Sequence, residues 1–528
     1  MTIVRFFLCS TLLLLFSAQF IFAQYNSEVY ADGELLVKYK NKYKNGTASE
    51  SAFSMNAQTG ATVLEEFPDL GWQRVKLPAG LSVNQAVSSY KSSAEVEIAQ
   101  PNFYYHLLNM SNDTRFSDLY AMQKISAPAA WDLSTGSAAT VVANIDTGIA
   151  YNHEDLAANM WRNPGETPGN GVDDDGNGFV DDYYGYDFFY NDSNPIDDAG
   201  GHGTHTSGTI GAVGNNSLGV VGVNWNVQLM AIKIYSPNGS DSTSAMLVNA
   251  YNYIRMMKNR GVNIRVTNNS YGGCGEACGY DQATKDAIDA LGDTGVLQVF
   301  AAGNSGQNVE TTAFYPASYT SPSILTVAAS DRNDNRSGFS NFGATGIDIA
   351  APGAGILSTY NSSYNSYATL SGTSMATPHV TGAAALLASY NPNLSAASLK
   401  ATLMNSVDSL PQWNGLVKSG GRLNVAKALQ NPTVCTYTLS SASQSISSGG
   451  GIFSFDVTAP SNCDFSTVSD TSWITVTSGN IGSGNGTLTF TVPSNSSGTS
   501  RVGTITVAGQ TFTVNQATGK SRKRVRFF

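Results

Sequence analysis

Four short fragments carry residue types that together can perform nucleophilic catalysis. They are VVANIDTGI with Asp146, GGHGTHTSGTIGA with His202, FAAGNSG with Asn304 and SGTSMATPH with Ser374. A serine hydroxyl is a weak nucleophile until a neighbouring imidazole accepts its proton. The imidazole needs a carboxylate that fixes its tautomer, and a developing oxyanion needs hydrogen-bond donors directed at it. The four residues therefore supply every part that acyl transfer requires.

Each of these residues also has an ordinary structural role. Asp146 could cap a strand end, and His202 with His205 could form a metal pair in a loop. Asn304 suits a turn between Gly and Ser, and Ser374 suits the N-cap of a helix. One such residue alone favours the structural role, whereas all four in the order Asp, His, Asn, Ser favour a catalytic group.

The elements that must position these residues lie in a middle unit, residues 111–430. Short apolar runs (VVANID, LMAIKIY, IRVTNNS, VLQVFAAG, ILTVAAS) alternate with helical stretches such as SAMLVNAYNYIRMMK and QATKDAIDAL. This alternation predicts an α/β fold, with a parallel sheet covered by helices on both faces. Asp146 and Asn304 follow two of these strands, at the edge where open parallel sheets hold their sites.

Two further units flank the middle one. Residues 24–110 combine strand-like runs (GELLVKY, VEIAQPNFYYHLL) with a short helical stretch, which predicts a small α+β domain. Residues 433–517 are rich in Ser, Thr, Gly and Val in short alternating runs, which predicts an all-β sandwich. A basic tail, residues 518–528, closes the chain.

The charge balance excludes one class of partner. The chain carries 29 basic and 39 acidic residues, a net charge of −10. Nucleic acid binding requires basic stripes, so we expect no nucleic acid partner. An acidic protein suits calcium, a hard cation that prefers carboxylate and carbonyl oxygens.

The first 23 residues have the pattern of a secretory signal. Arg5 precedes an apolar run, Phe6 to Phe16, and Ala23 offers a small residue before a cut. The alternative is a membrane anchor, but Ser17 and Gln19 break the run too early. We therefore expect a secreted, extracellular protein without a transmembrane segment after signal removal.

Four cysteines remain once the signal segment is set aside. An even count in an exported protein predicts two disulfides, and the order along the chain favours Cys274–Cys278 and Cys435–Cys463. Cys274 and Cys278 could instead form half of a metal site. No second Cys or His pair lies near them in the sequence, which favours the disulfide.

The stretch VDDDGNGFVDD, residues 172–182, has the spacing of a calcium loop. Gly178 falls at the sharp turn of such a loop, but Tyr184 replaces its last, bidentate ligand. The alternative is a solvated acidic turn. The predicted ligands, in chain order, are Asp173, Asp175, Asn177, Phe179 through its carbonyl, Asp181 and Asp182.

The four catalytic fragments closely resemble the motifs of the subtilisin-like serine peptidases, or subtilases. DTGI, GHGTHTSGT, AAGN and GTSMATPHV match those motifs and span the whole middle unit. The resemblance implies that Asp146, His202 and Ser374 form a catalytic triad and that Asn304 donates to the oxyanion. It implies a bacterial serine endopeptidase that hydrolyses peptide bonds through an acyl-enzyme.

The resemblance extends to the first unit and to substrate binding. VEIAQPNFYYHLL is similar to the end of the subtilase propeptide, which implies an intramolecular chaperone and inhibitor that is removed by a cut near residues 106–113. Subtilases bind an extended peptide between two strand edges, and here Phe314 corresponds to the pocket floor. Phe314 would disfavour large aromatic side chains, or it could simply pack under the loop. The implied edges are Ser270, Tyr271, Gly272, Ala301, Ala302 and Gly303.

The same resemblance implies two further calcium sites. One surrounds the loop VGNNSLGV, and the other lies in YGYDFFYND. The implied ligands of the first are Asp155, Val213, Asn216, Leu218 and Val220, and those of the second are Asp187 and Asp192.

The third unit resembles a BACON-type β-sandwich, with Trp473 in SWITV and the Cys435/Cys463 pair. The resemblance implies a carbohydrate or surface ligand, and the basic tail could contact an anionic surface. The alternatives are a spacer or a stability module. Two other functions stay open: a subtilase that transfers the acyl group to an amine, and an inactive adhesin. The adhesin predicts the loss of a triad residue, and none is lost.

Overall fold

The computed structural model describes residues 30–40, 50–104, 110–273 and 279–519. The chain divides into two compact units that meet between residues 107 and 108, and each is described by itself. The predicted signal segment and the predicted Cys274–Cys278 disulfide lie outside the described residues. Within the described ranges, no helix has the length and apolar character needed to cross a bilayer.

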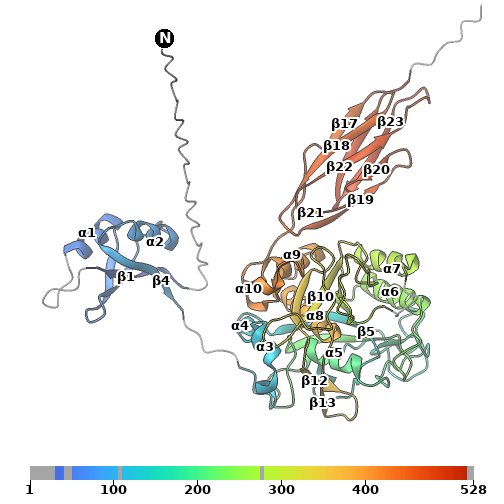
Figure 1. The fold of residues 1–528 in the computed structure, drawn as a ribbon, viewed down its shortest axis with the longest axis horizontal. Helices are drawn as coiled ribbons and strands as arrows, with labels where there is room; N and C mark the ends of the chain where they lie inside the picture. Colours follow the sequence, from blue (N-terminus) through green and yellow to red (C-terminus); the bar gives the residue numbers. More distant parts are fainter. Residues whose placement is uncertain (1–29, 41–49, 105–109, 274–278, 520–528) are drawn as a thin grey trace, which may run out of the picture. The chain divides into compact units, whose positions relative to one another are not determined.

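The first unit is a four-stranded antiparallel sheet with two helices, as expected for an α+β domain (Figure 1). The strand order is β2-β3-β1-β4. Buried Leu35, Val37 and Val75 alternate with half-buried residues along the central strands, as an antiparallel sheet with one covered face requires. The elements are β1 (Tyr30–Tyr39), α1 (Glu50–Thr59), β2 (Thr62–Phe67), β3 (Trp72–Lys76), α2 (Val83–Lys91) and β4 (Val96–Phe103).

The second unit is built on a nine-stranded sheet in the order β14-β15-β11-β10-β9-β8-β5-β7-β6. All neighbouring strands pair in parallel except β14 and β15, so the predicted parallel sheet is confirmed. The strands are β5 (Gly136–Asp146), β6 (Gly185–Asp187), β7 (Asn226–Lys233), β8 (Ile264–Asn269), β9 (Leu297–Ala301), β10 (Ile324–Ser330), β11 (Ile349–Pro352), β14 (Asp408–Ser409) and β15 (Gly421–Arg422).

Helices cover both faces of this sheet (Figure 1). Because side chains alternate along a strand, β5 sends Val142 into the core beneath one face and Ile145 into the core beneath the other. The first core holds α5 (His202–Gly211) and α8 (Thr373–Tyr390), and the second holds α6 (Ser244–Asn259) and α7 (Gln282–Gly292). The remaining elements are η2 (Phe116–Asp118), α3 (Tyr120–Lys124), α4 (Ala127–Trp131), η3 (Ala157–Asn159), β12 (Ile356–Tyr360), β13 (Ser366–Leu370), α9 (Ala396–Asn405), η4 (Pro411–Trp413) and α10 (Val425–Gln430).

The last part of the second unit is all β, as the sequence predicts. Two sheets, β16-β18-β22-β20 and β17-β24-β23-β19-β21, enclose a core of Phe455, Phe490 and Phe512. The rings of Phe455 and Phe512 stack with centroids 4.0 Å apart. The strands are β16 (Thr438–Leu439), β17 (Ser443–Ile446), β18 (Gly451–Thr458), β19 (Asp464–Ser469), β20 (Thr475–Ser478), β21 (Ile481–Ser483), β22 (Gly486–Val492), β23 (Arg501–Val507) and β24 (Gln510–Gln516).

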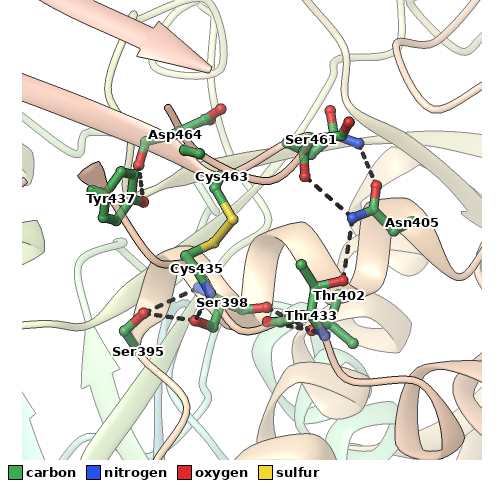
Figure 2. The surroundings of a disulfide bond; sticks show 12 residues. Ser395, Ser398, Thr402, Asn405, Thr433, Cys435, Tyr437, Ser461, Cys463 and Asp464 are labelled. Atoms are coloured by element: carbon green, nitrogen blue, oxygen red, sulfur yellow. Dashed lines mark hydrogen bonds between the residues drawn. A yellow bond between two sulfur atoms is a disulfide. The ribbon is translucent and has the colours of Figure 1, made fainter. Parts of the chain in front are cut away.

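A disulfide between Cys435 and Cys463 lies where this sandwich meets α9, and it confirms the predicted pairing (Figure 2). The backbone N–H of Cys435 donates to Ser398 Oγ at 3.0 Å. Two residues earlier, the N–H of Thr433 donates to Thr402 Oγ1 at 2.8 Å. The segment that leads into the sandwich is therefore both cross-linked and hydrogen-bonded along α9.

A buried lysine lies beside this disulfide. Lys400 on α9 is 4% exposed, and its ammonium lies 2.7 Å from Asp464 of the sandwich and 3.6 Å from Asp348 beside β11. Burial disfavours the charged form, but the two carboxylates outweigh that effect and raise the pKa of Lys400 above its ordinary value. Lys400 therefore remains charged and neutralises two buried carboxylates from different parts of the unit.

Replacing Lys400 with Met should destabilise the second unit strongly. The substitution leaves Asp348 buried without a cation and Asp464 with only Lys418, 3.9 Å away, and loss of a buried partner typically costs about 3–5 kcal/mol. The free energy of unfolding from urea denaturation of the purified variant measures the effect. The control is Lys427→Met, because Lys427 is half exposed and its pair with Asp408 should contribute less than about 1 kcal/mol. Equal losses in the two variants would contradict a role for the buried cluster.

Candidate active site

The end of β5 and the start of α5 bring a carboxylate against an imidazole. Asp146 is the last residue of β5, and His202 is the first residue of α5. The distance from His202 Nδ1 to Asp146 Oδ1 is 2.7 Å. Asp146 is 2% exposed, and its carboxylate also accepts hydrogen bonds from Thr147 N at 2.8 Å and Thr206 Oγ1 at 3.2 Å. Three hydrogen-bonding groups thus surround this buried carboxylate.

This contact sets the protonation chemistry of His202. Burial alone would lower the pKa of the imidazole, but the charge of Asp146, its hydrogen bond and the charge of Asp197 outweigh burial. The pKa of His202 is therefore raised. With Nδ1 held by Asp146, the imidazole has Nε2 left for proton transfer in the cleft that it lines.

The close approach of α5 to β5 requires glycine at position 203. A Cβ atom there would lie 2.1 Å from the carbonyl oxygen of Gly148 and 3.0 Å from the Cβ of Asp146. Both separations are shorter than a van der Waals contact, so any side chain would push the helix away from the strand. The residue after His202 therefore controls whether His202 can reach Asp146.

Ser374 enters the same cleft from the first turn of α8. Its hydroxyl donates to the carbonyl oxygen of Ser270 at 2.9 Å, and Ser270 Oγ donates back to the carbonyl oxygen of Ser374 at 2.9 Å. Ser374 and His202 line one cleft of about 280 Å³. The hydroxyl must rotate from Ser270 towards His202 before it can give up its proton, a difference that is common between free and substrate-bound sites.

Asn304 lies three residues after the end of β9 and contacts the start of α8. Its Oδ1 accepts from the backbone N–H of Thr373 at 2.8 Å and from Thr373 Oγ1 at 2.9 Å. These bonds occupy the amide oxygen and leave the Nδ2 donors to the cleft, which Asn304 lines. The backbone N–H of Ser374 lies in the first turn of α8, where the helix dipole favours negative charge. Two hydrogen-bond donors, Asn304 Nδ2 and the backbone N–H of Ser374, are thus available at the start of α8.

The predicted cleft walls lie on either side of the same cavity. Ser270, Tyr271 and Gly272 follow β8, and Ala301 and Gly303 belong to or follow β9; all five line the cleft. Ala302 does not line it. Its side chain is buried in a separate apolar cluster, because successive residues of a strand end point to opposite sides.

The ring of Phe314 lies between these two walls. A Cβ on Gly272 would lie 2.7 Å from the ring and one on Gly303 would lie 2.9 Å from it. Phe314 also packs against apolar side chains of the neighbouring cores. Its position, in the cleft and against the core, is compatible with either predicted role.

Tyr235 lines the cleft but lies outside the four catalytic motifs. It lies two residues after the end of β7, and this position is the signal that could have identified it, because residues that follow parallel strands meet at the carboxyl edge of the sheet.

The acidic loop brings three carboxylates together. Glu166, Asp173 and Asp175 each offer an oxygen within 4.8 Å of the other two. Glu166 lies outside the predicted loop and is 7% exposed, and its Oε2 is buried without a hydrogen-bond partner. Asp175 Oδ1 also lacks one, although Arg260 lies 3.2 Å away. Converging carboxylates with unsatisfied oxygens suit a hard cation.

The other predicted ligands of this loop point elsewhere. The carboxylate of Asp181 accepts from the backbone N–H groups of Asn170 and Gly171, at 3.0 and 2.8 Å. Asp182 is buried and accepts from three donors, Asn163, Asn177 and Tyr253. Its burial raises its pKa to about 6.

Asn177 and Phe179 complete the turn of the loop. Asn177 donates its backbone N–H to Asp173 Oδ1 at 3.0 Å, and its Oδ1 accepts from the N–H of Phe179 at 2.7 Å. The ring of Phe179 packs against Tyr186 and Tyr253. The structure therefore gathers Asp173 and Asp175 with Glu166, whereas Asp181 binds backbone N–H groups and Asp182 binds neighbouring side chains.

The second predicted calcium site contains a carboxylate pair. Asp155 is fully buried and accepts from Asn216 Nδ2 and from Val220 N, both at 2.8 Å. Asp113, which the sequence analysis missed, is 4% exposed and accepts from the N–H groups of Asn215 and Asn216. Burial raises the pKa of Asp155, and the charge of Asp113 raises it further. Among the described contacts, neither carboxylate has a basic partner.

The remaining members of this second site lie on the same loop. The N–H of Val213 donates to the carbonyl oxygen of Asp155 at 2.8 Å. The carbonyl of Leu218 accepts from Thr114 N at 3.0 Å. The segment that carries Asp113 is thereby fastened to the loop that carries Leu218 and Val220.

The third predicted site contains a lysine where calcium was expected. The ammonium of Lys233, which is 1% exposed, lies 3.0 Å from Asp187 Oδ2 and 2.7 Å from Asp198. Asp192 pairs with Asp187 only through the backbone, and its own carboxylate accepts from Asn194 N. The lysine already neutralises Asp187, which argues against a calcium ion there.

Family models match all three parts of the chain. A model of the subtilase family matches residues 137–434. A model of the fervidolysin N-terminal prodomain matches residues 17–102, and a model described as a putative binding domain, BACON, matches residues 443–517.

Individual relatives agree with the family models. Thermitase of Thermoactinomyces vulgaris is 39% identical over 320 residues, which are 60% of this chain and 99% of that protein. A thermophilic serine proteinase of Bacillus sp. (strain AK1) is 33% identical over 365 residues, covering 69% and 80%. Subtilisin Savinase of Lederbergia lenta is 37% identical over 295 residues, covering 56% and 93%. A solved protease from Pseudoalteromonas arctica has a TM-score of 0.49 at 29% identity, covering 61% of this chain and 98% of that one.

Proposed function

The chain belongs to the subtilase family of serine peptidases, and we propose that it cleaves peptide bonds internally through Ser374, His202 and Asp146. The observation that carries this proposal is the 2.7 Å contact between His202 Nδ1 and Asp146 Oδ1, in a cleft that Ser374 also lines. A carboxylate that holds Nδ1 leaves Nε2 to accept a proton, which is the arrangement that general-base catalysis requires.

In the first half of the reaction, Ser374 Oγ attacks the carbonyl carbon of the bound peptide. His202 Nε2 takes the hydroxyl proton as the new C–O bond forms, and Asp146 stabilises the resulting imidazolium. The imidazolium then gives this proton to the leaving amine as the C–N bond breaks. A water molecule repeats the attack on the ester with the same base, which releases the acid and restores Ser374.

The tetrahedral oxyanion would be bound by Asn304 Nδ2 and by the backbone N–H of Ser374. The support for Asn304 is that Thr373 already occupies its amide oxygen, so the donating end is held without cost during the reaction. One such donor typically contributes 10²–10³-fold to the rate.

We further propose that the substrate binds as an extended strand between residues 270–272 and 301–303. Phe314 lies between these walls, so the pocket for the side chain next to the cut is shallow. The expected preference is for small side chains and against large aromatic ones.

The fervidolysin-like match supports a precursor organisation. Residues 24–110 would assist folding and block the cleft until they are removed, and residues 1–23 would direct export. For the sandwich we propose a stabilising role, because its contacts with α9 include the disulfide segment and the buried Lys400–Asp464 pair.

Calcium is the cation proposed for the two carboxylate clusters. Glu166, Asp173 and Asp175 would form one site, and Asp113 with Asp155 would form the other. Oxygen-only ligands and net negative charge favour calcium over transition metals, which prefer nitrogen and sulfur. Bound calcium would neutralise these carboxylates and hold the loops between the strands and helices that carry Asp146 and His202.

Replacing Ser374 with Ala should leave the precursor uncut. Without the hydroxyl no acyl-enzyme forms, so the segment before residue 110 stays attached. Mass spectrometry of the purified protein measures its length. Ser389→Ala, at the other end of the same helix, is the control and should be processed like the wild type. Normal processing of the Ser374→Ala protein would rule out this nucleophile.

Chelation should lower the thermal midpoint of the protein. Calcium that binds only the folded state contributes about 2.7 kcal/mol when its free concentration is 100 times Kd. Glu166→Gln should remove part of the difference between calcium and chelator in calorimetry. Asp192→Asn is the control, because that carboxylate lies outside both clusters and should leave the difference unchanged. A midpoint that is insensitive to chelator contradicts both sites.

Replacing Phe314 with Gly should broaden the cleavage preference towards large aromatic side chains. The substitution removes the ring between Gly272 and Gly303 and deepens the pocket. Mass-spectrometric mapping of cleavage sites in a denatured protein mixture compares the two enzymes. Cleavage after small residues serves as the internal control, since it should continue at a similar rate. An unchanged preference for the residue before the cut would show that Phe314 does not limit the pocket.

A further inference from the structure

Asp197 lies five residues before His202, in the loop that leads into α5, and is 5% exposed. Its Oδ2 accepts from the backbone N–H of Thr204 at 3.0 Å and from Thr204 Oγ1 at 2.7 Å. Its Oδ1 accepts from the N–H of Gly201 at 3.4 Å and of Ala199 at 3.2 Å. One carboxylate thus connects the loop before α5 with the first turn of the helix.

The first turn of α5 cannot be capped in the usual way. Gly201 occupies the N-cap position with φ of 78°, and a Cβ there would lie 2.5 Å from the ring of Tyr360. A Ser, Asp or Asn side chain therefore does not fit at the position where it would normally accept from the first turn. Asp197 supplies this cap from outside the helix. Asn361 Nδ2 in turn donates to the backbone carbonyl oxygen of Asp197 at 2.9 Å.

Because His202 is the first residue of α5, this cap fixes the backbone that carries the imidazole. It acts on the backbone of the helix, whereas Asp146 holds the ring itself through Nδ1. The bonds of Asp197 to the helix backbone and the bond of Asp146 to the ring together define where His202 Nε2 lies in the cleft.

The charge of Asp197 also acts on the imidazole of His202. Its described hydrogen-bond partners are neutral donors, whereas the adjacent Asp198 pairs with the ammonium of Lys233 at 2.7 Å. The negative charge of Asp197 is therefore not cancelled by a cation, and it is one of the causes that raise the pKa of His202.

The other groups that face His202 come from every element around it. Asp146 ends β5, Tyr235 follows β7 and Ser374 lies in the first turn of α8, and all three line the cleft. On α5 itself, burial lowers the pKa of His205 to about 4, so His205 is neutral at working pH. Tyr235 is neutral too, since burial raises its pKa. Asp146 and Asp197 are thus the negative groups that act on the imidazole among the described residues around it.

We propose that Asp197 is a positioning residue for His202, which caps the helix that carries it and adds a second negative charge that stabilises the imidazolium. This inference rests on the proposed role of His202 as the catalytic base. It assigns to one side chain both a geometric and an electrostatic contribution, and the two can be separated by substitution.

Asp197→Asn keeps the shape of the side chain and removes the charge. In NMR titration of the folded protein, the pKa of His202 should fall relative to the wild type, by more than in Asp198→Asn. In the pH profile of kcat/KM with a peptide substrate, the acid limb should move to lower pH. The value of kcat should fall about ten-fold while KM changes little, because the imidazolium that forms during the reaction loses one stabilising charge.

Asp197→Glu keeps the charge and alters the cap. Its kcat should fall, while His202 titrates like the wild type. A purely structural role for Asp197 would lower kcat or the active fraction in both variants without moving the titration, and that result overturns the electrostatic contribution. Unchanged kcat in both variants overturns the positioning role. The NMR titration does not depend on turnover. If the wild type is inactive but Asp197→Asn still lowers the pKa of His202 as expected, the proposed function is contradicted and the role of Asp197 beside His202 is not.

Discussion

The hydrogen bond between Asp146 and His202 is the interaction on which the rest of the second unit depends. Its two residues are 56 positions apart and belong to a strand and a helix that must end and begin at the same point. Parallel pairing on both sides of β5 fixes the strand end, and the glycine after His202 lets the helix approach it. Once these two elements meet, the carboxyl edge of the sheet also receives Asn304 and the segment before Ser374.

Burying a carboxylate costs free energy, and the described contacts offset that cost in different ways. Asp146 and Asp197 are surrounded by neutral donors. Asp187 and Asp464 are paired with buried lysines. The cluster of Glu166, Asp173 and Asp175 keeps buried oxygens without hydrogen-bond partners, with Arg260 3.2 Å from Asp175, and burying such oxygens costs free energy unless positive charge offsets it. The type of neutralisation thus distinguishes residues that hold structure from residues that suit a cation.

Much of the fold could be predicted because its signals are local. Apolar strands alternate with helical segments around Asp146 and Asn304, and the alternating Ser, Thr and Val runs beyond residue 433 predict the sandwich that the structure contains. The direction of each carboxylate could not be predicted, because it depends on partners that are distant in sequence. Asp187 meets Lys233, Asp155 meets Asp113, and Asp173 meets Glu166 rather than Asp181. The direction of the Ala302 side chain, away from the cleft, could not be predicted either, because it depends on the alternation of side chains at a strand end.

The way in which the segment from Thr433 to Cys435 is held affects how easily the protein could cleave itself. A peptidase can also cleave other copies of itself, and exposed segments are the preferred sites of such cleavage. Cleavage in a strand-binding groove requires a segment that can detach and extend over several residues. Here the joint is bonded to α9 through Ser398 and Thr402 and closed by a disulfide. The joint therefore cannot detach and extend without breaking these bonds, which disfavours cleavage there.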